Sequence, residues 1–344
     1  MSILSNPKLR QVVRRAVKPF IPTGVILMYH RVGEPDLDPW SLHVTRKNFQ
    51  EQMEILRKYA NPISLRELAQ AQQKGQVPRR SVVITFDDGY ADNLYNAKPI
   101  LERYDIPATF FIATGHIGQE RGFWWDELQK LFLQPGKLPE KLTIEVDGTV
   151  HTWDLGTAAN YSQDDYQRDK GRRAYESDPS SRLGFYYSVW QTIQCFPKEA
   201  QLPAIEQIQA WVGSQVVTDP DDRSLLPEEL CTLGNRELTE IGAHTVTHPS
   251  LKEHSAEFQL KEIQESKAYL ETLLNRPVTS FAYPYGSYNS ETVSLLEQAG
   301  LDYACSCIEG LVWKGSNSFL LPRYHVHDWS AEEFAQQLEK WFNN

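Results

Sequence analysis

Short apolar segments alternate with helical patterns along most of this chain, and that alternation is the feature that most constrains its fold. Residues 82–86 form a β-branched run typical of a buried strand, and the pattern after Ser255 places apolar residues on one side of a helix. Ser64 with Glu67 marks a helix start. Repeated βα units imply a parallel sheet with right-handed crossovers. The expected strands cover residues 25–29, 82–86, 108–113, 241–244, 280–283, 303–306 and 320–326.

The alternation stops between residues 117 and 225. Residues 143–151 alternate around an Asp-Gly pair and predict a β-hairpin, whereas residues 158–178 are polar. We therefore predict an α/β fold closed as a TIM-like barrel, formed by residues 24–116 and 226–344, with an inserted subdomain at residues 117–225. A subdomain grown from a βα loop would lie on the same face as the site, either as a lid or substrate wall or as decoration without a catalytic role.

Two separated motifs place carboxylates and imidazoles at the ends of predicted strands. Thr85-Phe86-Asp87-Asp88-Gly89 breaks a buried strand into a glycine turn, and His244-Thr245-Val246-Thr247-His248 follows another short apolar segment. Parallel α/β folds build their sites at such strand ends. Asp88, His244 and His248 provide three ligands for one ion and leave a position for water, as a hydrolytic metal site requires. This set suits zinc best, although cobalt, manganese or nickel would also fit it.

Two more segments extend the pattern, Phe281-Ala282-Tyr283-Pro284-Tyr285-Gly286 and Leu321-Pro322-Arg323. Together with the first two motifs they resemble the polysaccharide deacetylase family, the divalent-metal amidohydrolases related to chitooligosaccharide, nodulation-factor and peptidoglycan deacetylases. The resemblance covers residues 24–116 and 226–342. It implies a barrel distorted to seven strands, with Asp87 as the general base and Asp88 as a metal ligand. It also implies that the backbone N–H of Tyr285 faces the developing oxyanion.

Structural roles compete with several of these assignments. The two aspartates of the first motif would otherwise cap the following helix, although Asp92 stands nearby for that task. Tyr285 would otherwise belong to a turn with a stacked aromatic ring. His30 ends the first strand and either lines the floor of the site or is a satisfied core histidine. Trp125 either covers a sugar ring or packs the insertion onto the barrel.

The last expected strand supplies further candidates. Its alternation puts Arg323, His325 and His327 on one face. Either histidine could be the general acid that protonates the leaving amine, and we prefer His327 because it is nearer the carboxyl end of the strand. Ala282 stands where many relatives carry an arginine that orients the base. We therefore predict that Arg323 orients Asp87 through its planar fork, the alternative being a surface ion pair.

Composition limits the partners and the location. A formal net charge of −10 argues against nucleic acid, because sequence-independent binding needs a basic face. The four cysteines show no metal-type spacing, and no stretch has the length of a membrane span or a signal segment, so we expect a cytoplasmic protein. Within an N-terminal segment of residues 1–23, residues 8–20 combine an apolar face with basic flanks. They predict either peripheral membrane contact or a helix that caps the barrel. The oligomeric state is not indicated.

These observations predict a metal-dependent hydrolase that removes acetyl groups from N-acetylated sugars of a polysaccharide, an oligosaccharide or a glycan precursor. One alternative is hydrolysis of another small amide or ester on the same scaffold. The other is a catalytically silent carbohydrate-binding module. The intact Asp87, Asp88, His244 and His248 argue against the silent module, because a binding protein needs no base beside a metal.

Overall fold

The computed structural model describes residues 22–119, 121–213, 222–235 and 237–343. Within these residues the main sheet follows the order β13-β12-β11-β6-β5-β1-β14, and a short strand, β4, also pairs with β5. All of these pairings are parallel, as the sequence predicts. The strands are β1 (Gly24–Tyr29), β4 (Asn61–Pro62), β5 (Ser81–Phe86), β6 (Ala108–Ile112), β11 (Thr239–Ala243), β12 (Ser280–Ala282), β13 (Tyr303–Cys305) and β14 (Tyr324–His325).

The segment that leads into β14 closes the sheet into a barrel. On one side Leu27 of β1 pairs with Tyr324 of β14. On the other side the N–H of Leu321 donates to the carbonyl of Ala304 in β13 at 2.9 Å, and the N–H of Ser306 donates back to the carbonyl of Leu321 at 2.9 Å. Residues 321–325 therefore contact both edges of the sheet. The predicted α/β fold with a distorted (β/α)7 barrel is confirmed.

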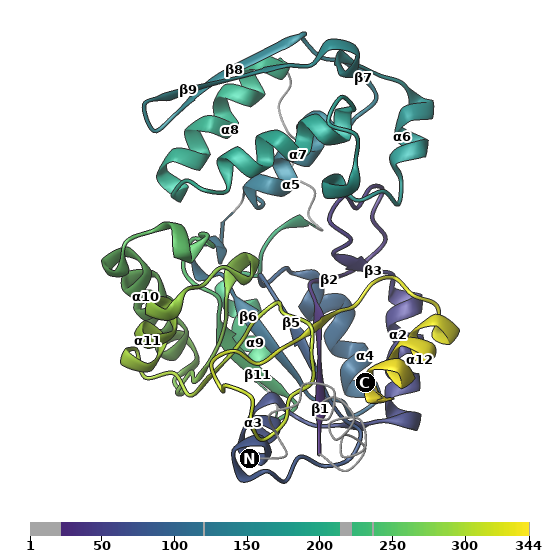
Figure 1. Ribbon diagram of the computed structural model, residues 1–344, viewed down its shortest axis with the longest axis vertical. Helices are drawn as coiled ribbons and strands as arrows, with labels where there is room; N and C mark the ends of the chain where they lie inside the picture. The colour runs from purple at the N-terminus through teal and green to yellow at the C-terminus, as the bar shows by residue number, and fades with distance from the viewer. Residues whose placement is uncertain (1–21, 120, 214–221, 236, 344) are drawn as a thin grey trace, which may run out of the picture.

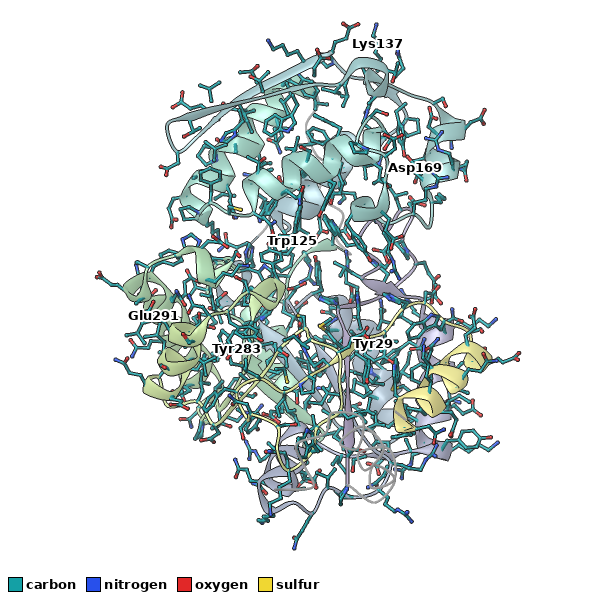
Figure 2. The ribbon with its side chains drawn as sticks, viewed as in Figure 1. Tyr29, Trp125, Lys137, Asp169, Tyr283 and Glu291 are labelled. Carbon is teal, nitrogen blue, oxygen red and sulfur yellow. The ribbon has the colours of Figure 1, made fainter. Side chains whose placement is uncertain are left out.

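A second body of structure lies between β6 and β11 along the chain. Figure 1 shows it above the carboxyl ends of the barrel strands, and Figure 2 shows Trp125 at the junction and Asp169 farther out. Its hairpin pairs Val146 with Thr149, which leaves an Asp-Gly pair as the two-residue turn that the sequence predicts. The boundaries at residues 117 and 225 stay a prediction. The elements are α5 (Trp124–Phe132), β7 (Gly136–Lys137), β8 (Lys141–Val146), β9 (Thr149–Asp154), β10 (Asn160–Tyr161), α6 (Gln163–Asp169), α7 (Arg182–Ile193) and α8 (Lys198–Val212).

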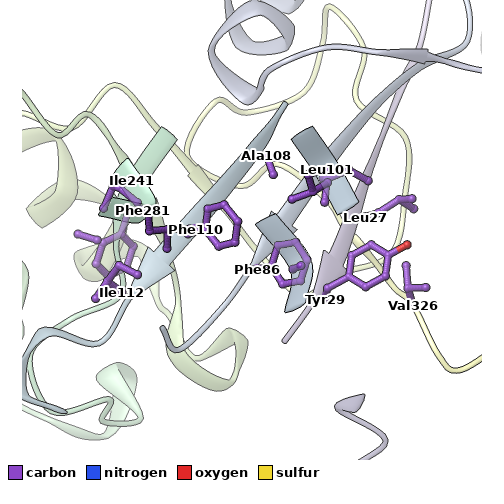
Figure 3. Close-up of a cluster of buried hydrophobic side chains, with 14 of the residues drawn as sticks. Leu27, Tyr29, Phe86, Leu101, Ala108, Phe110, Ile112, Ile241, Phe281 and Val326 are labelled. Carbon is purple, nitrogen blue, oxygen red and sulfur yellow. The ribbon is translucent and has the colours of Figure 1, made fainter. Parts of the chain in front are cut away.

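Helices surround the barrel and share a buried cluster with its strands. Leu27 and Tyr29 of β1 belong to this cluster, as Figure 3 shows. Ile26 of the same strand belongs to a separate cluster. This alternation places every second strand residue toward the helices. The helices are α2 (Arg46–Tyr59), α3 (Leu65–Lys74), α4 (Lys98–Arg103), α9 (Pro227–Gly234), α10 (Ala256–Leu274), α11 (Ser290–Gln298) and α12 (Ala331–Asn343), and a short strand pair joins β2 (Arg31–Val32) to β3 (His43–Val44).

Most buried apolar residues of the inserted subdomain form one hydrophobic cluster, which also includes Leu37, Tyr90 and Ala113 from the barrel part of the chain. Phe132, Leu142, Phe185 and Ile205 are among its buried residues, and they come from α5, β8, α7 and α8. The insertion therefore has a core distinct from the main barrel cluster, and the same core packs the insertion onto the barrel.

None of the helices that the structure describes is long and apolar enough to cross a membrane. The basic amphipathic pattern of residues 8–20 lies outside the described residues, so peripheral membrane contact stays a prediction.

Candidate active site

The first motif forms a sharp turn directly after β5. Thr85 is buried in the strand, and the two aspartates that follow Phe86 are also buried, with 2% and 4% of their surface exposed. Asp88 has a φ of 77° and Gly89 a φ of 88°, so two successive residues adopt left-handed conformations. Only glycine adopts this conformation without strain, and a side chain at position 89 would also press on Ile112. The turn thus holds two carboxylates side by side at the mouth of the barrel.

Asp88, His244 and His248 meet as the sequence predicts. The three side chains are buried, and one ligand atom from each lies within 4.8 Å of the others. Asp88 Oδ1 is 3.2 Å from Nε2 of His248 and 3.6 Å from Nε2 of His244. Across the described residues this is the one group of three such side chains close enough to share an ion. Two imidazoles and a carboxylate suit a divalent transition metal of the zinc type.

The hydrogen bond of His244 supports a metal-binding role. Its Nδ1 lies 2.7 Å from the carbonyl oxygen of Ala282, the last residue of β12. A carbonyl only accepts, so Nδ1 carries the proton and the lone pair of Nε2 faces Asp88. A ligating histidine is oriented in this way by a carbonyl on its other nitrogen. The residues present therefore fit a divalent cation.

The pKa shifts of Asp88 and His248 favour an ionised carboxylate and a neutral imidazole. Burial alone would raise the pKa of Asp88, but the neighbouring imidazoles of His244 and His248 hold it well below its usual range. Burial lowers the pKa of His248, which favours its neutral form. An ionised carboxylate beside neutral imidazole is the protonation state that a metal ligand set requires.

Arg323 holds Asp87 as the sequence predicts. Its two terminal nitrogens donate to the two carboxylate oxygens at 2.7 and 2.8 Å, and its Nε donates to the carbonyl of Ser306 at 3.0 Å. Arg323 has no exposed surface, which excludes the alternative of a surface ion pair. Burial would raise the pKa of Asp87, but the guanidinium charge outweighs it and the pKa is lowered. Asp87 is therefore ionised and aimed in one direction.

Tyr285 lies beside the metal-ligand group. It has a φ of 55°, and its ring centroid is 4.5 Å from that of His248. Its hydroxyl is buried and has no hydrogen-bond partner among the described residues, and its backbone N–H takes part in none of the hydrogen bonds found there. Both groups remain available for a ligand.

A cavity of about 170 Å³ lies over these residues and is walled by aromatic side chains from both parts of the chain. Trp125 is at the junction shown in Figure 2, with its ring 4.9 Å from that of His248 and its Nε1 donating to the hydroxyl of Tyr90 at 2.9 Å. It therefore both lines the cavity and packs the insertion onto the barrel. The lining residues are His30, Trp40, Leu42, Asp87, Asp88, Trp125, Trp190, His244, His248, Tyr283, Tyr285 and Cys307.

Four of the lining residues were not anticipated from the sequence: Trp40, Leu42, Trp190 and Cys307. Trp40 follows β2 and Trp190 is on α7, and their ring centroids are 4.3 Å apart. Cys307 follows β13. None of them belongs to a motif. The only signal in the sequence is the generous number of tryptophans, nine in all, which does not say which of them lie together.

The structure brings His30 into the cavity but not His327. The rings form a series, with centroids 5.4 Å apart between His30 and His325 and 4.6 Å apart between His325 and His327. Strand β14 ends at His325, and beyond it Nε2 of His327 accepts a hydrogen bond from Arg173 of the insertion at 2.9 Å. His327, the preferred candidate for the general acid, is therefore in contact with the insertion and is not among the residues that line the cavity.

Comparisons with known proteins agree with this geometry. A family model described as polysaccharide deacetylase matches residues 74–174 and 201–304, more than half of the chain. A poly-beta-1,6-N-acetyl-D-glucosamine N-deacetylase from Staphylococcus aureus (strain MSSA476) is 23% identical over 299 residues, which cover 87% of this chain and 71% of the relative.

Two solved structures share the fold. The deacetylase PplD of Streptococcus pyogenes, in complex with acetate, has a TM-score of 0.53 and 20% identity, and the likeness covers 92% of this chain and 98% of that one. IcaB from Ammonifex degensii has a TM-score of 0.58 and 16% identity, with coverage of 94% and 98%. The family match, the shared barrel and the Asp-His-His group lead to one conclusion: this chain belongs to the polysaccharide deacetylase family of hydrolases.

Proposed function

We propose that this chain is a metal-dependent de-N-acetylase that removes acetyl groups from N-acetylated sugars of a polysaccharide or a glycan precursor. One observation carries the proposal. An ionised carboxylate, Asp87, is fixed by Arg323 directly beside a three-ligand group at the floor of an aromatic-walled cavity. A binding module would have no need of a buried base oriented in this way.

Asp88, His244 and His248 would hold the cation, and the cation when bound would supply the Lewis acidity that amide hydrolysis needs. Zinc is the first choice for this ligand set, with cobalt, manganese and nickel as substitutes. The remaining steps fall to side chains and backbone groups of the chain. Asp87 takes the proton of the attacking water, and Arg323 keeps its carboxylate in the productive orientation.

The developing oxyanion and the leaving amine need a donor each. The backbone N–H of Tyr285 is free to donate to the oxyanion. We assign the protonation of the leaving nitrogen to the imidazolium form of His30 in place of His327, because His30 lines the cavity and its Nδ1 has no hydrogen-bond partner in the described part of the chain. Burial lowers the pKa of His30, and the charges of Asp88 and Asp87 oppose that shift and favour the protonated form. The aromatic walls formed by Trp40, Trp125 and Trp190 suit the apolar face of a pyranose ring.

The test is the release of acetate from a panel of N-acetylated substrates, with and without a chelator. Because the Staphylococcus aureus relative is named for poly-beta-1,6-N-acetyl-D-glucosamine, oligomers of that polymer come first, followed by other N-acetylated oligosaccharides and precursors. Acetate release that stops with chelator and returns with zinc is expected. Release of other acids from small esters or amides, and none from any N-acetylated sugar, would favour the alternative hydrolase.

Variants of the ligands test the metal centre separately. His244→Ala and His248→Ala should each lose the ion and the activity while the barrel still folds, because both residues lie beyond a strand end. Elemental analysis of the purified proteins measures this loss, with His254→Ala as a control outside the ligand group. Unchanged metal content in both ligand variants would contradict the assignment.

A further inference from the structure

The loop that carries His244 and His248 is held by a carboxylate outside the ligand group. Glu262 lies on α10, and only 6% of its surface is exposed. Its Oε2 accepts hydrogen bonds from the backbone N–H groups of Val246 and Thr247, each at 2.8 Å. Its Oε1 accepts a third from the hydroxyl of Thr247, also at 2.8 Å. One side chain thus binds both residues at the centre of the loop.

The loop needs such support because its backbone is strained. Thr245 has a φ of 64° and His248 a φ of 60°. A β-branched residue rarely adopts this conformation, which persists only where the surroundings fix it. The threonine hydroxyl contributes by accepting the N–H of His248 at 3.0 Å. Without further partners, a loop of this shape would relax and separate the two imidazoles.

The loop between His244 and His248 is held by hydrogen bonds on two sides. Its carbonyls at Thr245 and Val246 accept hydrogen bonds from the N–H groups of Thr114 and Gly115, at 3.1 and 2.7 Å. Its N–H groups point the other way and are satisfied by Glu262. On the barrel side the hydrogen-bond partners of the loop are backbone groups of Thr114 and Gly115. On the opposite side the N–H groups of Val246 and Thr247 depend on the side chain of Glu262.

We propose that Glu262 is a positioning residue that pre-organises His244 and His248 for the metal ion. The inference rests on the proposed metal centre. Outer partners of metal ligands typically contribute a factor of about 10–100 to metal affinity. Glu262 acts one step farther out, through the backbone between the two ligands, and it binds at two adjacent N–H groups, so we expect an effect within that range.

The chemistry of the contact predicts which replacement restores it. The two backbone N–H groups need an acceptor, whereas the hydroxyl of Thr247 can either donate or accept. None of the three hydrogen bonds needs a full negative charge on residue 262. A glutamine at this position keeps one oxygen for the two N–H groups and turns its amide toward the hydroxyl of Thr247, which can accept as well as donate. Burial raises the pKa of Glu262, which also favours an uncharged group there.

The experiment compares the zinc dissociation constants of the wild-type protein, Glu262→Ala and Glu262→Gln, measured by competition with a chromophoric chelator. Glu265→Ala is the matched control, because this glutamate is exposed on the same helix. We expect weakening of about 10–100-fold in Glu262→Ala, wild-type affinity within about 3-fold in Glu262→Gln, and no change in the control. Cobalt absorption spectra of the same proteins report whether the ligand geometry changes.

The outcomes separate this inference from the proposed function. Wild-type affinity in a folded Glu262→Ala would overturn the positioning role alone. Absence of zinc binding in the wild-type protein would instead contradict the metal centre itself. If Glu262→Ala does not fold, Thr247→Val removes only the third bond and should weaken zinc binding by a few fold. Unchanged affinity in that variant would count against the role of Glu262.

Discussion

The barrel mouth and the insertion wall contribute different kinds of side chain to one cavity. The barrel supplies charged and titratable groups: Asp87 accepts hydrogen bonds from Arg323, and His244 donates one to the carbonyl of Ala282. The insertion supplies Trp125 and Trp190, which are held by ring contacts and by a separate hydrophobic cluster. The reacting groups therefore all come from the barrel, whereas the insertion contributes only to the aromatic wall, which it shares with Trp40 of the barrel part.

This division has a kinetic consequence. A defect in the barrel groups should reduce turnover on every substrate, because the reacting atoms are the same. A defect in the insertion should matter only for substrates large enough to touch its wall, because remote contacts contribute binding energy that a small substrate lacks. Substitutions in the two regions can sharpen or break this comparison.

The largest effect is expected for Asp87→Asn. Loss of a general base lowers kcat by about two to four orders of magnitude. The loss should be equal on an N-acetylated oligosaccharide and on a small activated acetate ester, with metal content unchanged. Asp302→Asn, an exposed carboxylate on the barrel, is the control. Loss of metal instead of turnover would mean that Asp87 and Asp88 exchange roles.

Arg323→Lys should have the next largest effect. The charge persists, but the two parallel bonds to Asp87 do not, and misplacement of a reacting group by about 1 Å costs about 10²-fold. The melting temperature should also fall by a few degrees, because the buried guanidinium bonds Ser306 and Thr85 as well. Steady-state kinetics and thermal melts measure both, beside the exposed control Arg103→Lys. Wild-type turnover would show that Asp87 is held in some other way.

A smaller and substrate-dependent effect is expected for Trp190→Ala. Aromatic contacts contribute about 0.5–1.5 kcal/mol, so KM for an oligosaccharide should rise up to about 10-fold while kcat/KM for a small acetate ester stays near wild type. Trp313→Ala is the control, since its ring is 43% exposed and does not line the cavity. Equal losses on both substrates would mean that the wall only supports the barrel, and the proposed division would fail.

The smallest effect concerns the junction of the two regions. Asp126 of the insertion accepts a hydrogen bond from Tyr90 of the barrel at 2.9 Å, and burial raises the pKa of Asp126 to about 7. This pKa lies above that of an aspartate in the unfolded chain. The contribution of Asp126 to the free energy of unfolding is therefore fully present at low pH and is lost as pH rises through 7.

The wild-type protein should therefore lose a few degrees of melting temperature relative to Asp126→Asn between pH 5 and pH 8. Thermal melts across this range, at constant ionic strength, measure the difference. Parallel curves for the two proteins would show that the junction does not titrate there.

The strands of the barrel could be predicted because each is a short buried run with its own turn signals. The ligand group followed from this arrangement, since parallel strands place Asp88 and His244 at the same end of the barrel. The pairing of Arg323 with Asp87 could also be predicted, because the arginine expected near position 282 is missing from the sequence. For these features the local sequence pattern and the order of the strands were sufficient for a correct prediction.

The remaining features depend on contacts that no local pattern encodes. Trp40 and Trp190 meet although 150 positions separate them, and this contact depends on how the insertion docks. Glu262 is one of many glutamates on an amphipathic helix until the loop beside it is known. His327 was preferred over His325 on strand position, but the strand stops before it. Where an element ends is the detail that a sequence specifies least.

The left-handed residues at positions 88, 245, 248 and 285 bear on attempts to engineer this protein. Each such residue costs the fold about 1–3 kcal/mol when its conformation is strained. Replacements that relax the backbone there, such as glycine at position 88, would raise thermal stability while removing one of the proposed metal ligands. A library selected for heat resistance alone would therefore be expected to accumulate inactive variants at these positions, so such a screen should be paired with a measurement of turnover.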